Sequence, residues 1–484
     1  MQLNNFNLQI LLIFLIIILI IEFILIKFIY KIHIILLLFY IYILPILSIF
    51  FFILTVELSL GKLRTKRIKF TKSFINNIIK QIKKKQKKSY NQKYTVTIKL
   101  FKFLIKQNNI NSINTFFKKS DFKIFSNNKK ILKKIIYDIK KAKYKIEMIF
   151  YIWKQGGIVN KIIESLINAS KRGICCRIIL DSVGCFSFLK SKYIILMKKA
   201  GIKIIKAFKL NMFDFLVRRI DIRQHKKIIL IDNYIVYTGS MNMIDINFNI
   251  NKKYIDIMIR FTGIISNIIS IIYDLEFEME TGEKIIFKKK YKKIKRTYYH
   301  KKNQNFHIIS SIPYISNKLI HKVFLKALHS AKKKIVITTP YFIPTNKLIK
   351  EICNASLRGV KVIIIIPKKN DSLMVLWASK YFYIDLLKSG VKIYEFKNNL
   401  LHTKSLLIDD KVSIIGTVNF DIRSFFLNSE ITLIIEDNNF SNIISQIQKT
   451  YIKKSKLIKF KKWKKRSYFN KLFEFFFFIF NPIL

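Results

Sequence analysis

The sequence HKKIILIDNYIVYTGSMN, from His225 to Asn242, recurs as HTKSLLIDDKVSIIGTVN, from His402 to Asn419. Both copies keep the spacing H-x-K-x4-D-x6-G-S/T-x-N. At ordinary residue frequencies, six fixed positions match by chance with a probability on the order of 10⁻⁷ per window. The two stretches therefore indicate a duplication.

Three shorter stretches upstream recur in the same order. They are Ala142–Trp153 with Ala331–Phe342, NASKRGICCRIIL ending at Leu180 with NASLRGVKVIIII ending at Ile366, and KKAGIKIIKAF from Lys198 with LKSGVKIYEF from Leu387. In the second and third, a helix-like stretch ends in small residues and Gly before an apolar β-branched run, which is typical of a helix followed by a buried strand. Two copies about 180 residues apart predict an α/β fold of two similar lobes, because a solenoid needs more and shorter units.

The repeated constellation predicts a polar site at one face of a hairpin. His225 and Lys227 are two residues apart, so on a strand both side chains point to the same face. Asp232 is expected to turn the chain, and the returning strand then brings Ser240 and Asn242 back beside the first two residues. The second copy is expected to present the same set: His402, Lys404, Asp409, Thr417 and Asn419.

This set of side chains suits a phosphate group. A Lys ammonium neutralises charge, while Asn and Ser or Thr donate hydrogen bonds to phosphate oxygens. An imidazole can act as nucleophile or as proton donor. A single His on a strand is more often structural, but two constellations in register favour catalysis by both histidines and both lysines. Asp232 and Asp409 are candidates for catalysis, with turn formation as the alternative.

These residues resemble the phospholipase D superfamily. Within it, RQHKKIILIDNYIVYTGSMN and LLHTKSLLIDDKVSIIGTVNFDIRS are similar to bacterial cardiolipin synthases. The resemblance implies two lobes that meet across a pseudo-twofold interface and convert two phosphatidylglycerol molecules to cardiolipin and glycerol. One His would form a phosphohistidine, and the other would protonate the leaving glycerol oxygen and then deprotonate the acceptor hydroxyl. The resemblance implies neither a metal nor another cofactor.

The resemblance also implies, downstream of each motif, an acidic residue that bonds the histidine of that motif. Asp256 and Glu430 fit this position. Thr417 stands where the family usually has Ser, and the first lobe has Asp where the second has Glu. The family analogy favours His225 as the nucleophile, although the sequence leaves this assignment open, as it does the acyl-chain preference and the oligomeric state.

The amino-terminal residues 1–60 predict a transmembrane hairpin. Two apolar runs, Ile10–Ile26 and Ile34–Val56, are each close to the roughly 20 residues that span a bilayer as a helix. A signal peptide is the alternative, but the basic start, short apolar core and small-residue cleavage site are missing. Positive charges between Lys62 and Arg67 predict that the large domain lies in the cytoplasm, on a bacterial inner membrane.

The remaining boundaries follow from composition. Residues 61–120 are expected to form a Lys-rich connector, 121–295 the first lobe and 296–455 the second. Residues 456–484 carry a basic cluster before the run Phe475–Phe478, which is too short to span a bilayer. An interfacial basic-aromatic segment is expected there, with a buried terminal helix as the alternative.

Composition limits the partners. The 484 residues carry a formal net charge of +61, which favours an anionic membrane surface or a nucleic acid, unless the many lysines reflect an AT-rich genome. Phosphatidylglycerol and anionic membrane lipid are the expected partners, and no nucleic acid is expected. The alternatives are a related phospholipid hydrolase or transferase, a phosphodiester nuclease, and a non-catalytic membrane scaffold.

Overall fold

The computed structural model describes residue 67 and residues 115–117, 120–209, 221–245, 253–283, 305–311, 318–397 and 399–481. The chain divides into two compact units, Met1–Ser59 with Met212–Ile220 and Leu60–Asn211 with Asp221–Leu484. All described residues belong to the second unit. Among them, no helix has the length and apolar character needed to cross a membrane. The predicted membrane spans lie outside the described residues.

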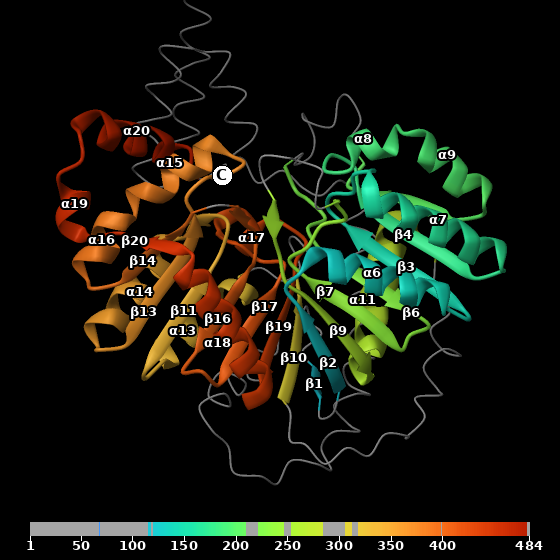
Figure 1. Cartoon of the computed structure of the whole chain (residues 1–484), viewed down its shortest axis with the longest axis horizontal. Helices are drawn as coiled ribbons and strands as arrows, with labels where there is room; N and C mark the ends of the chain where they lie inside the picture. The colour runs from blue at the N-terminus through green and yellow to red at the C-terminus, as the bar shows by residue number, and fades with distance from the viewer. Residues whose placement is uncertain are drawn as a thin grey trace, which may run out of the picture. The chain divides into compact units, whose positions relative to one another are not determined.

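The first lobe is built on a seven-stranded mixed sheet (Figure 1). In sheet order its strands are β2 (Ser120–Phe125), β9 (Met258–Gly263), β7 (Ile235–Gly239), β6 (Ile228–Ile231), β3 (Lys145–Phe150), β4 (Cys175–Asp181) and β5 (Lys203–Ala207). Strands β3, β4 and β5 run parallel, and the other neighbours pair antiparallel.

The second lobe repeats this sheet and extends it at both edges. Its nine strands, in order, are β1 (Thr115–Phe117), β10 (Asn305–Ser310), β19 (Ile431–Glu436), β17 (Val412–Gly416), β16 (Ser405–Ile408), β11 (Lys334–Thr338), β13 (Lys361–Pro367), β14 (Lys392–Phe396) and β20 (Ser455–Leu457). The seven strands from β10 to β14 correspond one by one to those of the first lobe. The predicted duplicated α/β architecture is confirmed.

Two short edge strands of the second lobe's sheet come from the segments on either side of the two lobes in the sequence. Strand β1, within the expected connector, pairs with β10 and so belongs to the second lobe's sheet. Strand β20 pairs with β14 and carries the start of the expected tail into the same sheet. A three-residue edge strand has too little periodicity to be recognised in a Lys-rich sequence.

Helices cover both faces of each sheet. The first lobe contains α6 (Asn128–Lys140), α7 (Gly157–Lys171), α8 (Phe186–Leu189), α9 (Lys192–Lys199) and α11 (Ile264–Thr281). The second contains α13 (Leu319–Ser330), α14 (Asn346–Leu357), α15 (Leu373–Tyr381), α16 (Tyr383–Lys388), α17 (Ile422–Phe426), α18 (Asn438–Lys453), α19 (Phe460–Lys464) and α20 (Tyr468–Ile479). Their order along the chain follows the duplication.

Alternating side chains divide each sheet between two cores. In β3, Ile146 and Met148 pack with α6 and α7, whereas Ile149 points to the opposite face, as the two-residue period of a strand requires. That opposite face joins α11, α18 and the corresponding face of the second sheet in one apolar cluster, in which Phe261 and Phe306 contact edge to face at 5.9 Å. The two lobes therefore share a core, which fixes their active-site edges relative to each other.

Two short backbone contacts between the lobes lie at this shared edge. Strand β8 (Tyr254–Ile255) of the first lobe pairs in parallel with β15 (Leu400–Leu401) of the second. Gln224 and Ser429 form a single parallel bridge in the reciprocal position. A further pair, β12 (Phe342–Ile343) with β18 (Phe420–Asp421), lies within the second lobe. In each of the two contacts between the lobes, one partner is the residue that directly precedes a motif histidine: Leu401 before His402, and Gln224 before His225.

Candidate active site

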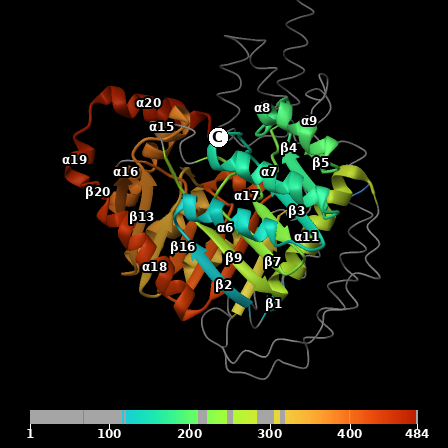
Figure 2. The ribbon, with the colours of Figure 1, turned by 45° about the vertical axis from the view of Figure 1, so that its right-hand side comes forward.

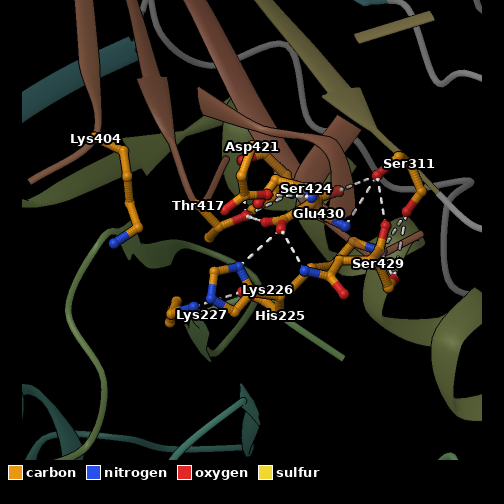
Figure 3. A network of polar contacts seen from close by, with 12 residues as sticks. His225, Lys226, Lys227, Ser311, Lys404, Thr417, Asp421, Ser424, Ser429 and Glu430 are labelled. Atoms are coloured by element: carbon orange, nitrogen blue, oxygen red, sulfur yellow. Dashed lines mark hydrogen bonds and ion pairs between the residues drawn. The ribbon is translucent and has the colours of Figure 1, made fainter. Parts of the chain in front are cut away.

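The His225 side chain is held by a carboxylate from the other lobe. Its Nδ1 lies 2.8 Å from Oε1 of Glu430, and both side chains are buried. The backbone explains this pairing, because the His225 N–H donates to the Ser429 carbonyl at 2.9 Å and thereby aligns it with the residue before Glu430. Figure 3 shows Glu430 between the His225 ring and Thr417.

The second motif reverses the arrangement. Nδ1 of His402 lies 2.7 Å from Oδ1 of Asp256, and the His402 N–H donates to the Ile255 carbonyl at 2.9 Å. Both expected acids bond a motif histidine, but each bonds the histidine of the other lobe and not that of its own motif. Each pair therefore joins the lobes. In both histidines the Nδ1 contact leaves Nε2 as the nitrogen for chemistry.

The motif glycines allow this geometry. A Cβ on Gly239 would lie 2.3 Å from the Ile257 carbonyl oxygen, and one on Gly416 would lie 2.2 Å from that of Ile431. Only Gly therefore permits β7 and β17 to approach the strands that follow the two acids. The same approach brings the hydroxyl after each glycine to a carboxylate.

The hydroxyls of Ser240 and Thr417 bind the two acids, whereas the sequence predicted that they bind phosphate. Ser240 Oγ donates to Oδ1 of Asp256 at 2.7 Å, and Thr417 Oγ1 donates to Oε2 of Glu430. Each hydroxyl also accepts from a backbone N–H at 3.0 Å. Because Thr keeps the hydroxyl, it makes the contacts that Ser makes in the first lobe.

Lys227 and Lys404 supply the positive charge of the site. Each Nζ donates to the carbonyl of its own motif histidine at 2.7 Å, and both side chains are buried. Burial lowers the pKa of Lys227 well below its usual value and lowers that of Lys404 to about 8, although Asp256 and Glu430 act in the opposite direction. An anionic phosphate near these amines would stabilise their charged form.

Asn242 and Asn419 are buried in equivalent positions after the motif hydroxyls. In each, the Oδ1 atom has no hydrogen-bond partner among the described residues. A buried amide oxygen without a partner is uncommon in proteins. Their placement keeps both side chains as candidates for binding substrate.

Asp232 and Asp409 lie away from the histidines. Both occupy the first central position of a hairpin turn with positive φ, 54° and 52°, which confirms the predicted turn. Asp232 accepts from three successive backbone N–H groups, those of 143–145, at 2.7–3.0 Å. Asp409 accepts from those of 332–334 at 2.7–3.3 Å. These contacts favour the turn-forming alternative, since the strands β6 and β16 lie between each Asp and its motif histidine.

The two acid–imidazole pairs differ in charge. Burial raises the pKa of Glu430 to about 7, although Lys227 and hydrogen bonds act against it. Burial would also raise the pKa of Asp256, but the contacts with His402 and Lys404 outweigh it and hold the pKa below its usual value. The His225 pKa is lowered well below its usual value by burial and then by the lysines. The His402 pKa is also lowered by burial, with Asp256 offsetting part of the effect.

Other residues of the site escaped sequence reasoning. The ring of Tyr151 lies edge to face with His225 at 4.9 Å, and that of Tyr254 lies likewise against His402 at 5.6 Å. Lys226, between the two motif residues, forms a fully buried ion pair with Glu276 of α11. An inward-pointing Lys226 is hard to predict, because alternation on a strand would turn it away from the site. His225–Lys227 in fact precede β6 in a non-strand segment.

Comparison with known proteins identifies the family. The family described as "Cardiolipin synthase, PLD-like domain" matches twice, over residues 135–264 and 324–453. Cardiolipin synthase A of Wigglesworthia glossinidia brevipalpis is 44% identical over 451 residues, 91% of this chain and 89% of that protein. Cardiolipin synthase A of Yersinia pestis is 39% identical over 444 residues, 91% of this chain and 90% of that protein.

A solved structure supports the fold. Phosphatidylserine synthase of Haemophilus influenzae Rd KW20 superposes with a TM-score of 0.59 at 15% identity, over 79% of this chain and 99% of that one. At this identity the likeness concerns the fold alone. With two matched domains and relatives similar over nearly their whole length, the chain belongs to the cardiolipin synthase family of phospholipase D-like proteins.

Proposed function

We propose that this chain is a phosphatidyltransferase that converts two phosphatidylglycerol molecules to cardiolipin and glycerol. The observation that carries the proposal is the reciprocal pairing of His225 with Glu430 and of His402 with Asp256. It puts two oriented imidazoles and two ammonium groups in one buried site. The names of the relatives supply the product, cardiolipin.

His225 is the nucleophile in this proposal. Its lowered pKa keeps the imidazole neutral, and Glu430 fixes the proton on Nδ1 so that Nε2 carries the lone pair. Nε2 attacks the phosphorus of the first phosphatidylglycerol, and the bond from phosphorus to the headgroup glycerol oxygen breaks. The product on the enzyme is phosphatidyl-His225, whose positive ring charge lies beside Glu430.

His402 is the general acid and then the general base. Asp256, with its lowered pKa, is ionised and stabilises the protonated ring. Nε2–H gives its proton to the leaving glycerol oxygen, which departs as glycerol. The neutral His402 then takes the proton from a hydroxyl of a second phosphatidylglycerol. That oxygen attacks phosphorus, the bond to His225 breaks, and cardiolipin leaves with both histidines restored.

Lys227 and Lys404 serve the same step electrostatically. Charge accumulates on the phosphoryl oxygens when five groups surround phosphorus, and buried ammonium groups stabilise it more strongly than water does. Asn242 and Asn419, whose amides lie beside the motifs, would donate hydrogen bonds to those oxygens. Ser240 and Thr417 act indirectly by holding the two acids.

The same proposal includes membrane anchoring. The apolar runs Ile10–Ile26 and Ile34–Val56 would hold the enzyme in the bacterial inner membrane, with the two lobes on the cytoplasmic side. Anionic lipid would serve as substrate and as the electrostatic partner of a chain with net charge +61. The oligomeric state has no bearing on the chemistry, because one chain contains both motifs.

The experiment uses the full chain in mixed micelles of detergent and phosphatidylglycerol, with a chelator present. Glycerol and cardiolipin are measured together, and His402→Ala serves as the matched variant. Equal molar amounts of the two products, lost in the variant, are expected. Glycerol with phosphatidic acid and no cardiolipin would identify a hydrolase, and no turnover would contradict the proposal.

A further inference from the structure

Helix α20 is apolar on two faces, only one of which is covered. Its inward face packs on α15, where Phe478 stacks on Tyr381 with ring centroids 3.9 Å apart. Arg466 closes the turn before the helix through an ion pair with the buried Glu474. These contacts explain why the helix stays on the second lobe.

The outward face of α20 has no comparable cover. Phe469, Leu472, Phe473 and Phe476 are all exposed, Phe469 by 72%. Their spacing of i, i+3, i+4 and i+7 defines one continuous stripe along the helix. Because a helix of 12 residues is roughly 18 Å long, it is too short to span a bilayer. A helix that exposes an apolar stripe but is too short to span a bilayer is typical of a helix that lies at the membrane interface.

Helix α15 continues this surface toward the active-site edge. Leu373 and Met374, at its start, are exposed, Leu373 by 69%. They follow β13, which runs parallel to β11. His402 precedes β16, which is antiparallel to β11. The start of α15 and His402 therefore lie at the same edge of the sheet.

The first lobe carries an equivalent feature at the equivalent place. Val183 and Phe186 follow β4, the counterpart of β13, and both are exposed, Phe186 by 57%. By the same strand directions they lie at the edge that holds His225. Both views show α8 and α9 of the first lobe and α15 and α20 of the second at the same end of the strands (Figures 1 and 2).

Cations border the apolar residues. Helix α19 and the turn after it carry four exposed lysines, at 461, 462, 464 and 465. In the first lobe, Lys190 Nζ lies 4.2 Å from the centre of the Phe186 ring, and in the second, Lys380 Nζ lies 4.1 Å from that of Trp377. A second copy of the chain would bring like charges together, whereas anionic headgroups complement them.

We propose that the outward face of α20, the start of α15 and the segment Val183–Phe186 form one surface that rests in the headgroup region of an anionic bilayer. This surface presents the active-site edge of both lobes to the lipid from which substrates come. Its purpose rests on the proposed lipid reaction, but its existence can be tested without turnover.

The test uses the intrinsic tryptophans of the full chain. Trp377, in the middle of α15, lies beside the proposed surface, with its ring 5.8 Å from that of Phe473, whereas Trp153 is fully buried in the first lobe. The chain is reconstituted in phosphatidylglycerol vesicles with or without brominated acyl chains, which quench nearby indoles. The third tryptophan, Trp463 in α19, is replaced by Phe in every protein compared. Quenching that the additional change Trp377→Phe largely removes is expected.

The variant is Phe469→Glu with Phe476→Glu, and the matched control is Leu357→Glu. Leu357 is exposed by 72%, as Phe469 is, but ends α14 before β13 begins and so lies at the opposite edge. The double variant should lower the ratio of docked to undocked protein at least about tenfold and reduce cardiolipin formation in vesicles. Turnover of a short-chain, monomeric phosphatidylglycerol should stay unchanged in both.

Two results would contradict the proposal that this surface rests on the bilayer. One is unchanged quenching in the double variant, including the case in which that variant alters self-association instead. The other is an equal loss of quenching in Leu357→Glu. Normal quenching without any cardiolipin would contradict the proposed function and leave the surface intact.

Discussion

The two half-sites share a motif and a sheet, yet they hold their histidines in different surroundings. His225 faces Glu430, whose pKa burial raises to about 7, whereas His402 faces Asp256, whose pKa lies below its usual value. The residue after each histidine differs as well. Lys226 forms a buried ion pair, while Thr403 exchanges a hydrogen bond with Tyr451 at 3.1 Å.

This difference teaches how a duplicated fold supports an asymmetric reaction. The shared core and the exchanged backbone contacts impose the same geometry on both halves. Burial lowers the pKa of both imidazoles, but Asp256 offsets part of this lowering at His402, so His402 is the ring that takes up a proton more readily. A strictly symmetric site would have no reason to begin the reaction at one histidine rather than the other.

The largest effect should come from removing the histidines. His225→Ala and His402→Ala should each lower kcat about 10⁴-fold or more, because nucleophile and proton donor are both required. The two variants should differ in activity towards a substrate whose leaving group needs no proton, such as a p-nitrophenyl phosphodiester. There His402→Ala should retain a burst of nitrophenol and His225→Ala none; equal behaviour would contradict the assignment.

The next effect concerns stability. Lys226→Met leaves the buried Glu276 carboxylate without its cation, so the free energy of unfolding should fall by about 3–5 kcal/mol. Thr403→Val at the equivalent position removes two neutral hydrogen bonds, to the Ile255 carbonyl and the Tyr451 hydroxyl, and should cost about 2 kcal/mol. Denaturant unfolding of the full chain in detergent checks both. Similar losses of unfolding free energy in the two variants would mean that Lys226 and Thr403 stabilise the two lobes equally.

The acids should show an unequal, smaller effect. Asp256→Asn removes the negative charge beside protonated His402 and should lower kcat about 10²- to 10³-fold. Glu430→Gln changes a carboxyl that is half protonated near neutral pH and should cost only about tenfold. Initial rates in phosphatidylglycerol micelles measure both. A larger loss in Glu430→Gln would reverse the roles of the two pairs.

The smallest effect is a pH dependence. Glu430, with a pKa of about 7, acts in its ionised form, so kcat/KM should rise with pH through that value. Lys404, with a pKa of about 8, acts as a cation, so kcat/KM should fall above that value. Glu430→Gln should remove the rising limb and keep the falling one. A profile unchanged in that variant would assign the limb to another group.

Much of this site was predictable from the sequence, because the repeat carries the motif twice in register. The repeat predicted the lobes, and the motif residues Asp232 and Asp409 predicted the turns. The exchange of Asp256 and Glu430 between lobes was not predictable, since it depends on β8 pairing with β15 and on the bridge from Gln224 to Ser429. Two-residue contacts between distant segments leave no periodic signal in a single sequence.

The chemistry of the hydroxyls was also misjudged from the sequence. Ser240 and Thr417 have groups that could bind phosphate, but the motif glycines bring them against the carboxylates instead. Lys226 was overlooked for a related reason. A Lys between two site residues on a strand would point to solvent, whereas here the chain is not yet in a strand and the side chain enters the interface between the lobes.

The most direct measurement identifies the residue that carries the phosphatidyl group. His402→Ala, which should form the intermediate slowly and resolve it poorly, is incubated with phosphatidylglycerol labelled in the phosphate. It is then denatured at alkaline pH, where phosphohistidine survives, and its peptides are analysed by mass spectrometry. The account predicts the label on the peptide containing His225 and none in His225→Ala. Label on His402 in His225→Ala, with none on His225 in the other variant, would contradict it.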